Sequence, residues 1–162
     1  MDVFLGFDGG GTKTECIALD SDGRVAGQGK AGASNPLRVG YDAACAALQL
    51  AAAGALSLAK ASSNDVLGVC AGLAGAGRSN VSVQMCARLA RIWTRASIQV
   101  ITDAEVALET AIGQRPGVVL IAGTGSIAIG RNANGDIARV VTLKVEATET
   151  GVTLHISVPQ RS

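Results

Sequence analysis

Short apolar runs alternate with polar turns along the first thirty residues, and this pattern predicts three strands. The runs cover residues 3–8, 13–20 and 24–31. Ser21-Asp22-Gly23 is typical of a tight turn between the second run and the third. Because the connections between the runs are short, we expect an antiparallel three-stranded meander.

The spacing of apolar residues then changes to that of helices. Asn35-Pro36 predicts the start of one long helix, since Asn is a good N-cap and Pro suits the first helical position. Apolar residues follow at helical spacing from Leu37 to Ala59. Two further strand–helix pairs are predicted, with strands over 65–73 and 97–102 and helices over 80–93 and 103–113.

The last part of the chain returns to strand patterns. Residues 117–122, 127–131 and 136–140 indicate the opening of a second antiparallel meander, with glycine turns between the runs. Alternation over 152–158 predicts one more strand.

Composition narrows the class of protein. The 162 residues are 48% hydrophobic and 17% charged, which indicates a globular chain with a sizeable core. The net charge of +1 argues against nucleic-acid binding. The chain has no apolar run of about 18 residues and no signal-peptide pattern at its start, so we expect a cytoplasmic protein without a membrane span. The four cysteines lack C-x-x-C spacing and are expected to be reduced and buried.

A glycine turn between the first two strands carries the strongest chemical signal. The stretch Asp8-Gly9-Gly10-Gly11-Thr12-Lys13 ends one strand and begins the next. Glycines let the backbone bend and approach a ligand closely, and we expect Gly10 and Gly11 to need torsions or clearance that a side chain denies. Amide groups in such a turn can converge on phosphate, with the Thr12 hydroxyl adding a hydrogen bond. Asp8 is well placed to hold a phosphate-bound Mg²⁺.

Two rival readings of this stretch are weaker. A P-loop needs Lys-Ser or Lys-Thr after its last glycine and then a helix, whereas Thr12-Lys13 has the reverse order and a strand follows. A plain hairpin turn remains the simpler alternative, although two glycines would be enough for it.

The motif Asp8 to Thr14 resembles the first phosphate motif of the sugar kinase, Hsp70 and actin superfamily. Within it, the chain resembles the branch that joins N-acetylglucosamine kinases to the activating ATPases of benzoyl-CoA and hydroxyacyl-CoA reductases. The resemblance implies an α/β fold whose β-β-β-α-β-α-β-α order forms a ribonuclease-H-like lobe. It also implies that Gly9, Gly10, Gly11, Thr12 and Lys13 bind the phosphates of ATP.

A second glycine turn, Gly123-Thr124-Gly125-Ser126, follows the strand predicted at 117–122. With Ala128 it fits the dinucleotide fingerprint, but that fingerprint needs a helix next and Ile127-Ala128-Ile129 is strand-like. The turn resembles the family's second phosphate motif, which implies that these four residues also approach ATP. An ordinary hairpin turn is the alternative.

Three more positions are candidates through the resemblance. Asp103 follows a strand, and Thr102-Asp103-Ala104 resembles the Asn-Asp-Ala motif whose aspartate is the catalytic base of the sugar kinases; a helix N-cap is an equal alternative. Asn35 matches a position at the sugar pocket, with helix capping at least as good an explanation. Gly72 lies in a segment that matches one bordering the substrate.

The likeness is expected to cover about residues 3–140. This predicts a lobe over 1–115, the start of a second lobe over 116–140 and a non-matching strand-like tail over 141–162. The resemblance thus implies an ATP- and Mg²⁺-dependent kinase of an amino sugar such as N-acetylglucosamine, represented by its amino-terminal part. An activator ATPase and an inactive nucleotide-binding remnant are the alternatives, and exposed strands predict self-association.

Overall fold

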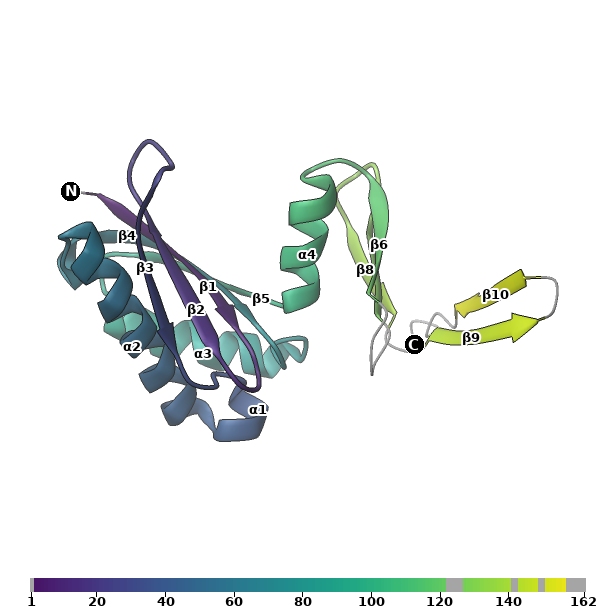
Figure 1. Cartoon of the computed structure of the whole chain (residues 1–162), viewed down its shortest axis with the longest axis horizontal. Helices are drawn as coiled ribbons and strands as arrows, with labels where there is room; N and C mark the ends of the chain where they lie inside the picture. Colours follow the sequence, from purple (N-terminus) through teal and green to yellow (C-terminus); the bar gives the residue numbers. More distant parts are fainter. Residues whose placement is uncertain (1, 122–126, 141–142, 149–150, 157–162) are drawn as a thin grey trace. The chain divides into compact units, whose positions relative to one another are not determined.

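The computed structural model describes residues 2–121, 127–140, 143–148 and 151–156. The chain divides into two compact units, residues 1–103 and 104–162, and each is described by itself below (Figure 1).

A mixed five-stranded sheet forms the frame of the first unit. Its strands lie in the order β3-β2-β1-β4-β5. The first three pair antiparallel, as the short connections predicted, whereas β4 and β5 run parallel to β1. The strands are β1 (Val3–Gly9), β2 (Thr14–Leu19), β3 (Val25–Ala31), β4 (Val66–Leu73) and β5 (Ser97–Ile101). The predicted α/β arrangement of a three-stranded meander followed by alternating elements is therefore confirmed.

Helices cover one face of this sheet (Figure 1). They are α2 (Tyr41–Ala59) and α3 (Ser79–Ile92). The short helix α1 (Pro36–Val39) precedes α2 and contacts it, and a 3-10 turn, η1 (Ser63–Asp65), precedes β4. The prediction of one long helix from Asn35 to Ala59 is wrong, because Gly40 divides this segment into two helices. Gly40 adopts φ 83° and ψ 162°, an extended left-handed conformation that ends α1 and starts α2 in a new direction.

The helix α2 lies directly on the backbone of β3. A Cβ atom added to Gly27 would lie 2.0 Å from the carbonyl oxygen of Ala55, and one added to Gly29 would lie 1.9 Å from that of Ala51. Glycine on the strand and alanine on the helix therefore allow a contact that no larger pair could make.

By length and composition, α2 is the one helix among the described residues that could cross a membrane. Its packing gives a different explanation for its apolar character. Ala44, Leu48, Ala51 and Ala55 are fully buried between the helix and the sheet. The helix is thus part of the core of the first unit.

The core of the first unit is built from aliphatic side chains of the sheet and the helices. From α3, Val81, Met85 and Leu89 are fully buried, and Trp93 just after the helix packs on Phe7 with ring centroids 5.8 Å apart. Leu37 was expected to face inward, but it is 51% exposed because Gly40 separates α1 from the periodicity of α2.

The second unit contains α4 (Asp103–Ile112), which begins at the junction between the units, and three antiparallel strands, β6 (Gly117–Ile121), β7 (Ile127–Arg131) and β8 (Ile137–Val140). Ala104 and Leu108 of α4 pack against Ile129 of β7. From the sequence we expected no helix to cover these strands, and the packing of α4 on β7 corrects that expectation. A separate hairpin follows, formed by β9 (Leu143–Thr148) and β10 (Gly151–Ile156).

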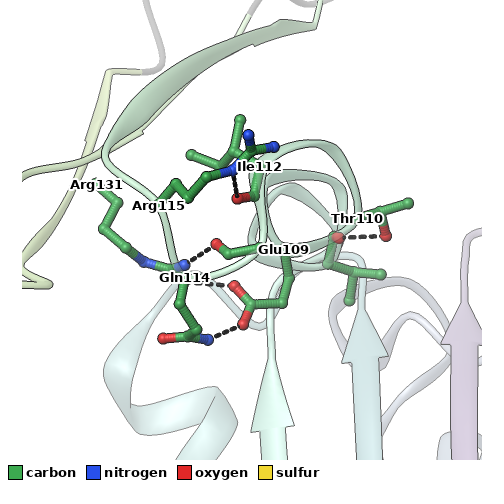
Figure 2. Close-up of polar contacts among 8 residues, drawn as sticks. Glu109, Thr110, Ile112, Gln114, Arg115 and Arg131 are labelled. Carbon is green, nitrogen blue, oxygen red and sulfur yellow. Dashed lines mark hydrogen bonds and ion pairs between the residues drawn. The ribbon is translucent and has the colours of Figure 1, made fainter.

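Polar contacts join the helix to the strands in this unit. Figure 2 shows Arg131 of β7 reaching the carbonyl of Gly113 and the carboxylate of Glu109 at the end of α4, with 2.6 Å between Arg131 Nη2 and Glu109 Oε2. The Arg131 side chain is almost fully buried. A buried arginine that donates to two acceptors at the end of α4 fixes the helix end to the sheet.

Candidate functional site

Three parallel strands, β1, β4 and β5, end at the same edge of the first sheet, and the predicted site residues lie at or just after their ends. Asp8 of β1 lies in register with Gly72 of β4, which lies in register with Ile101 of β5. Asp103 comes two residues after Ile101. The topology thus brings Asp8, Gly72 and Asp103 to one edge, where loops of parallel sheets commonly bind ligands.

The glycine turn at this edge is held by backbone hydrogen bonds to two other segments. Within the turn, the Gly10 amide donates to the carbonyl of Lys13 at 2.9 Å. The Gly9 carbonyl accepts from the Ala74 amide at 2.8 Å, which ties the turn to the loop after β4. The Gly10 carbonyl accepts from the amides of Ser34 and Asn35 at 3.0 and 3.1 Å. The turn is therefore pinned on two sides, unlike the tip of an isolated hairpin.

The steric role of the glycines differs from the expectation. Gly9, Gly10 and Gly11 are not among the described glycines with positive φ. A Cβ atom at Gly10 would meet nothing closer than 3.6 Å, whereas one at Gly9 would lie 2.3 Å from Ser34 Oγ and 2.5 Å from Leu73 Cδ2. The residue that needs clearance is thus Gly9, and the clearance is needed for packing of the turn against its neighbours.

A pair of buried hydroxyl groups lies beneath the turn. The Thr14 hydroxyl donates to the carbonyl of Gly32 at 2.6 Å, and Ser34 Oγ lies 2.7 Å from Thr14 Oγ1. Both side chains are completely buried. Sequence reasoning missed this pair, because Ser and Thr side chains are mostly exposed in proteins. Their contact fixes the segment before α1 against the start of β2.

Charged side chains flank the turn on the face of the sheet away from the helices. Asp8 is exposed there, opposite Glu15 in the β1–β2 register. Glu15 pairs with Lys30 at 3.0 Å and with Lys13 at 3.3 Å, and hydrogen bonds from these two ammonium groups hold the pKa of Glu15 below its usual range. Among the described residues, none pairs with the Asp8 carboxylate, which leaves its oxygens available to a ligand.

Asn35 performs the capping role that the sequence suggested. Its side-chain oxygen accepts from the Leu37 amide at 3.0 Å, with Pro36 in the first turn of α1. The Asn35 side chain also lies against Gly75, where an added Cβ atom would be 2.7 Å from Oδ1. Capping uses the oxygen alone, so the amide nitrogen can still serve a ligand.

The remaining predicted site residues are placed only in part. Gly72 is buried in β4, and Asp103 is exposed at the start of α4. Gly123, Thr124, Gly125 and Ser126 lie outside the described residues. The second phosphate loop therefore stays a prediction.

The four cysteines lie in β2, α2, β4 and α3 of the first unit. Cys16 and Cys45 are buried, and Cys70 and Cys86 are partly buried. Burial raises the pKa of Cys16 to about 12, so this thiol stays protonated at neutral pH. Within the described ranges, no group of three or more His, Cys, Asp or Glu residues is arranged to hold a metal ion.

Comparison with known proteins now adds to the geometry. The profile of the BadF/BadG/BcrA/BcrD ATPase family matches residues 5–158. This match extends past residue 140, where the resemblance was expected to end.

Two curated relatives are each 32% identical to this chain. One is the N-acetyl-D-glucosamine kinase of Dictyostelium discoideum, matched over 143 residues, and the other is the N-acetylmuramic acid/N-acetylglucosamine kinase of Clostridium acetobutylicum, matched over 139 residues. The matches cover 83% and 86% of this chain but 45% of each relative. The chain therefore spans about half the length of these kinases.

A solved structure shows the same fold. The structure of a candidate N-acetylglucosamine kinase from Chromobacterium violaceum superposes with a TM-score of 0.71 at 23% identity. The superposition covers 86% of this chain and 48% of that one.

Proposed function

Because the chain belongs to the BadF/BadG/BcrA/BcrD ATPase family, we propose that it is the amino-terminal lobe of an ATP-dependent kinase of an amino sugar such as N-acetylglucosamine. The observation that carries the proposal is the pinned glycine turn at the edge of the sheet where β1, β4 and β5 end. The sugar kinases among its relatives support the choice of substrate.

In this proposal the glycine turn binds the phosphates of ATP. The amides of Gly9, Gly10, Gly11 and Thr12 and the Thr12 hydroxyl donate to phosphate oxygens, while Lys13 adds positive charge beside them. The loop Gly123-Thr124-Gly125-Ser126, which resembles the family's second phosphate motif, is proposed to bind the phosphates as well. Two phosphate loops of this kind hold the nucleotide without a P-loop.

The residues present fit Mg²⁺ bound together with ATP. Mg²⁺ keeps most of its water and takes one or two carboxylates besides the phosphates, and the exposed Asp8 carboxylate has no partner among the described residues. Asp8 would hold the ion, directly or through water. The ion supplies neutralisation of the negative charge on the phosphates.

Asp103 is the proposed base for the sugar hydroxyl. A kinase of this type needs a carboxylate that accepts the hydroxyl proton as the oxygen attacks the terminal phosphate. Asp103 follows β5 at the same edge as Asp8 and Gly72. Gly72 and the free amide group of Asn35 are proposed to border the sugar.

An activator ATPase is the second candidate, and the ATPase name of the family favours it. Such activators couple ATP hydrolysis to electron transfer through a cysteine-held iron–sulfur cluster at a dimer interface. Here Cys16 and Cys45 are buried in the core, where burial raises the pKa of both thiols. These two residues therefore do not suit a cluster, and the kinase is the better proposal.

One experiment separates these functions. The chain, completed with the second half of a kinase relative, is incubated with Mg²⁺ and ATP labelled at its terminal phosphate, with and without N-acetylglucosamine, and transfer of label to the sugar is compared with release of inorganic phosphate. Sugar-dependent transfer supports the kinase, and sugar-independent hydrolysis supports the activator. Binding of ATP by calorimetry without turnover in the completed chain supports an inactive nucleotide-binding module, and no binding at all overturns the proposal.

The expected surroundings of the protein are part of the same proposal. Its partners are the sugar and ATP, with neither nucleic acid nor membrane involved, and it acts in the cytoplasm. The division into a lobe over 1–115, the start of a second lobe over 116–140 and a tail over 141–162 is likewise proposed.

A further inference from the structure

Arg38 of the short helix α1 lies against the glycine turn. A Cβ atom added to Gly11 would be 3.0 Å from Arg38 Nη1 and 3.7 Å from Arg38 Cδ. The guanidinium group and the end of its stem therefore rest on the backbone of Gly11. The absence of a side chain at residue 11 leaves room for this contact.

The same backbone hydrogen bonds that pin the turn also place Arg38. The amides of Ser34 and Asn35 donate to the Gly10 carbonyl, and the Arg38 amide donates to the Asn35 carbonyl at 3.0 Å. The Asn35 cap and Pro36 fix the first turn of α1. Only the Arg38 side chain itself is free to move relative to Gly11, since the backbone on both sides of the contact is held.

The charge of Arg38 is available to a ligand. Lys13, the other cation at the turn, is engaged by the carboxylate of Glu15 at 3.3 Å. Arg38 is exposed, and no described residue accepts a hydrogen bond from its guanidinium group or forms an ion pair with it. The turn thus has one cation, Lys13, that shares the Glu15 carboxylate with Lys30, and a second cation, Arg38, that has no ion pair among the described residues.

We propose that the Arg38 guanidinium binds the terminal phosphate of the Mg²⁺·ATP held at the glycine turn. This proposal rests on the proposed function and adds a residue to its phosphate site. A guanidinium group presents a planar pair of N–H donors that matches two phosphate oxygens, so it suits this role better than an ammonium group. The Arg38 side chain lies beside Gly11 of the turn. Lys13, by contrast, forms an ion pair with Glu15.

The test compares the 162-residue chain with three variants by calorimetry, using Mg²⁺·ATP and Mg²⁺·ADP as probes. Arg38→Gln removes the charge, Arg38→Lys keeps the charge without the planar fork, and Arg24→Gln is the matched control. Arg24 is also exposed, but it pairs with Asp22 in the hairpin at the opposite end of β2. Thermal unfolding of each variant checks that the fold is unchanged.

We expect Arg38→Gln to weaken Mg²⁺·ATP binding by about 10-fold, the size of one charge-assisted hydrogen-bond pair, with a smaller effect on Mg²⁺·ADP. Arg38→Lys should lie between this variant and the parent chain, and Arg24→Gln should bind like the parent. Equal ATP affinity of Arg38→Gln and Arg24→Gln would overturn the assignment of Arg38 while leaving the proposed function in place.

Two further outcomes would also overturn it. If the parent chain binds neither nucleotide, the proposed function fails and the role of Arg38 fails with it. If Arg38→Gln leaves ATP binding unchanged but weakens binding of N-acetylmuramic acid and not of N-acetylglucosamine, the guanidinium serves the carboxylate of an acidic sugar instead of a phosphate.

Discussion

The three glycines of the turn have different surroundings, although they are the same residue type. Gly9 is packed between Ser34 and Leu73, Gly10 has room for a Cβ atom with its nearest neighbour, the Lys13 carbonyl oxygen, at 3.6 Å, and Gly11 lies under Arg38. The sequence shows three equivalent glycines. Their difference comes from what the segments after β3 and β4 bring against them.

The first prediction separates Gly9 from Gly10. Replacing Gly9 with Ala puts a methyl group 2.3 Å from Ser34 Oγ and 2.5 Å from Leu73 Cδ2, and such overpacking should lower the free energy of unfolding by about 1–3 kcal/mol. Gly10→Ala, with its nearest neighbour at 3.6 Å, is the matched control and should unfold like the parent. Denaturant unfolding of both variants gives the comparison. Equal stability of the two would mean that Ser34 and Leu73 move aside without cost.

A second prediction concerns the proposed base. Asp103→Asn keeps a side chain that can cap α4 but removes the proton acceptor. In a chain completed with the second half of a kinase relative, we expect sugar phosphorylation to fall by about 10²–10⁴-fold, with ATP affinity nearly unchanged. Asp22→Asn, at the exposed β2–β3 turn, is the control. An Asp103→Asn enzyme that keeps nearly full activity would show that Asp103 belongs to α4 but takes no part in catalysis.

At the scale of elements, the closest contact in the first unit joins α2 to β3. Two glycines on the strand let the helix backbone approach, so the helix packs on the sheet through main-chain atoms as well as side chains. The position of α2 in turn sets the position of α1 and of Ser34, which hold the glycine turn. The stability of this contact therefore matters for the site as well as for the core.

The third prediction tests that contact. A methyl group at Gly29 would lie 1.9 Å from the carbonyl oxygen of Ala51, and because backbone atoms cannot rotate away, α2 would have to move off the sheet. We expect Gly29→Ala to lower the free energy of unfolding by about 3 kcal/mol. Gly32→Ala is the control, because an added Cβ atom there meets nothing within 4 Å. Thermal unfolding followed by circular dichroism would measure both, and similar midpoints for the two variants would contradict the close packing.

The sequence predicted the elements well because their signals are local. Alternation located β1 to β5, and Asn35-Pro36 located the start of α1, whose cap the structure confirms. The break at Gly40 was missed, since the helical spacing of apolar residues continues across it and a single glycine does not by itself end a helix. Leu37 was therefore assigned to the core, whereas it is exposed.

The candidate site could be predicted only as far as its motifs reach. The run Asp8 to Lys13 located the turn, and the order of the strands placed Gly72 and Asp103 at the same edge. The buried Thr14–Ser34 pair and the contact of Arg38 with Gly11 depend on how residues 32–38 return to the turn after β3. No local pattern encodes such a contact between segments.

At the scale of the whole molecule, the second unit differs from the first in how much of its apolar surface is buried. The first unit has a sheet covered on one face by α2 and α3. In the second unit, α4 packs on β7 through Ala104, Leu108 and Ile129, but several apolar residues of the strands stay exposed. Val118 is 72% and Leu120 47% exposed, and Ile121 and Ile137 are also open to solvent.

The last prediction follows from this exposed surface. Exposed apolar side chains and free strand edges tend to find a partner, so we expect the 162-residue chain to self-associate through β6 and β8 of the second unit. Size-exclusion chromatography with light scattering should show species larger than a monomer, in proportions that rise with protein concentration. The double variant Val118→Lys and Leu120→Lys should shift the chain toward the monomer, because charge on an exposed strand opposes edge pairing, whereas Val83→Lys, at an exposed position of α3 in the first unit, should leave the association unchanged. A parent chain that stays monomeric at all concentrations, or a double variant that associates as the parent does, would show that this surface does not drive assembly.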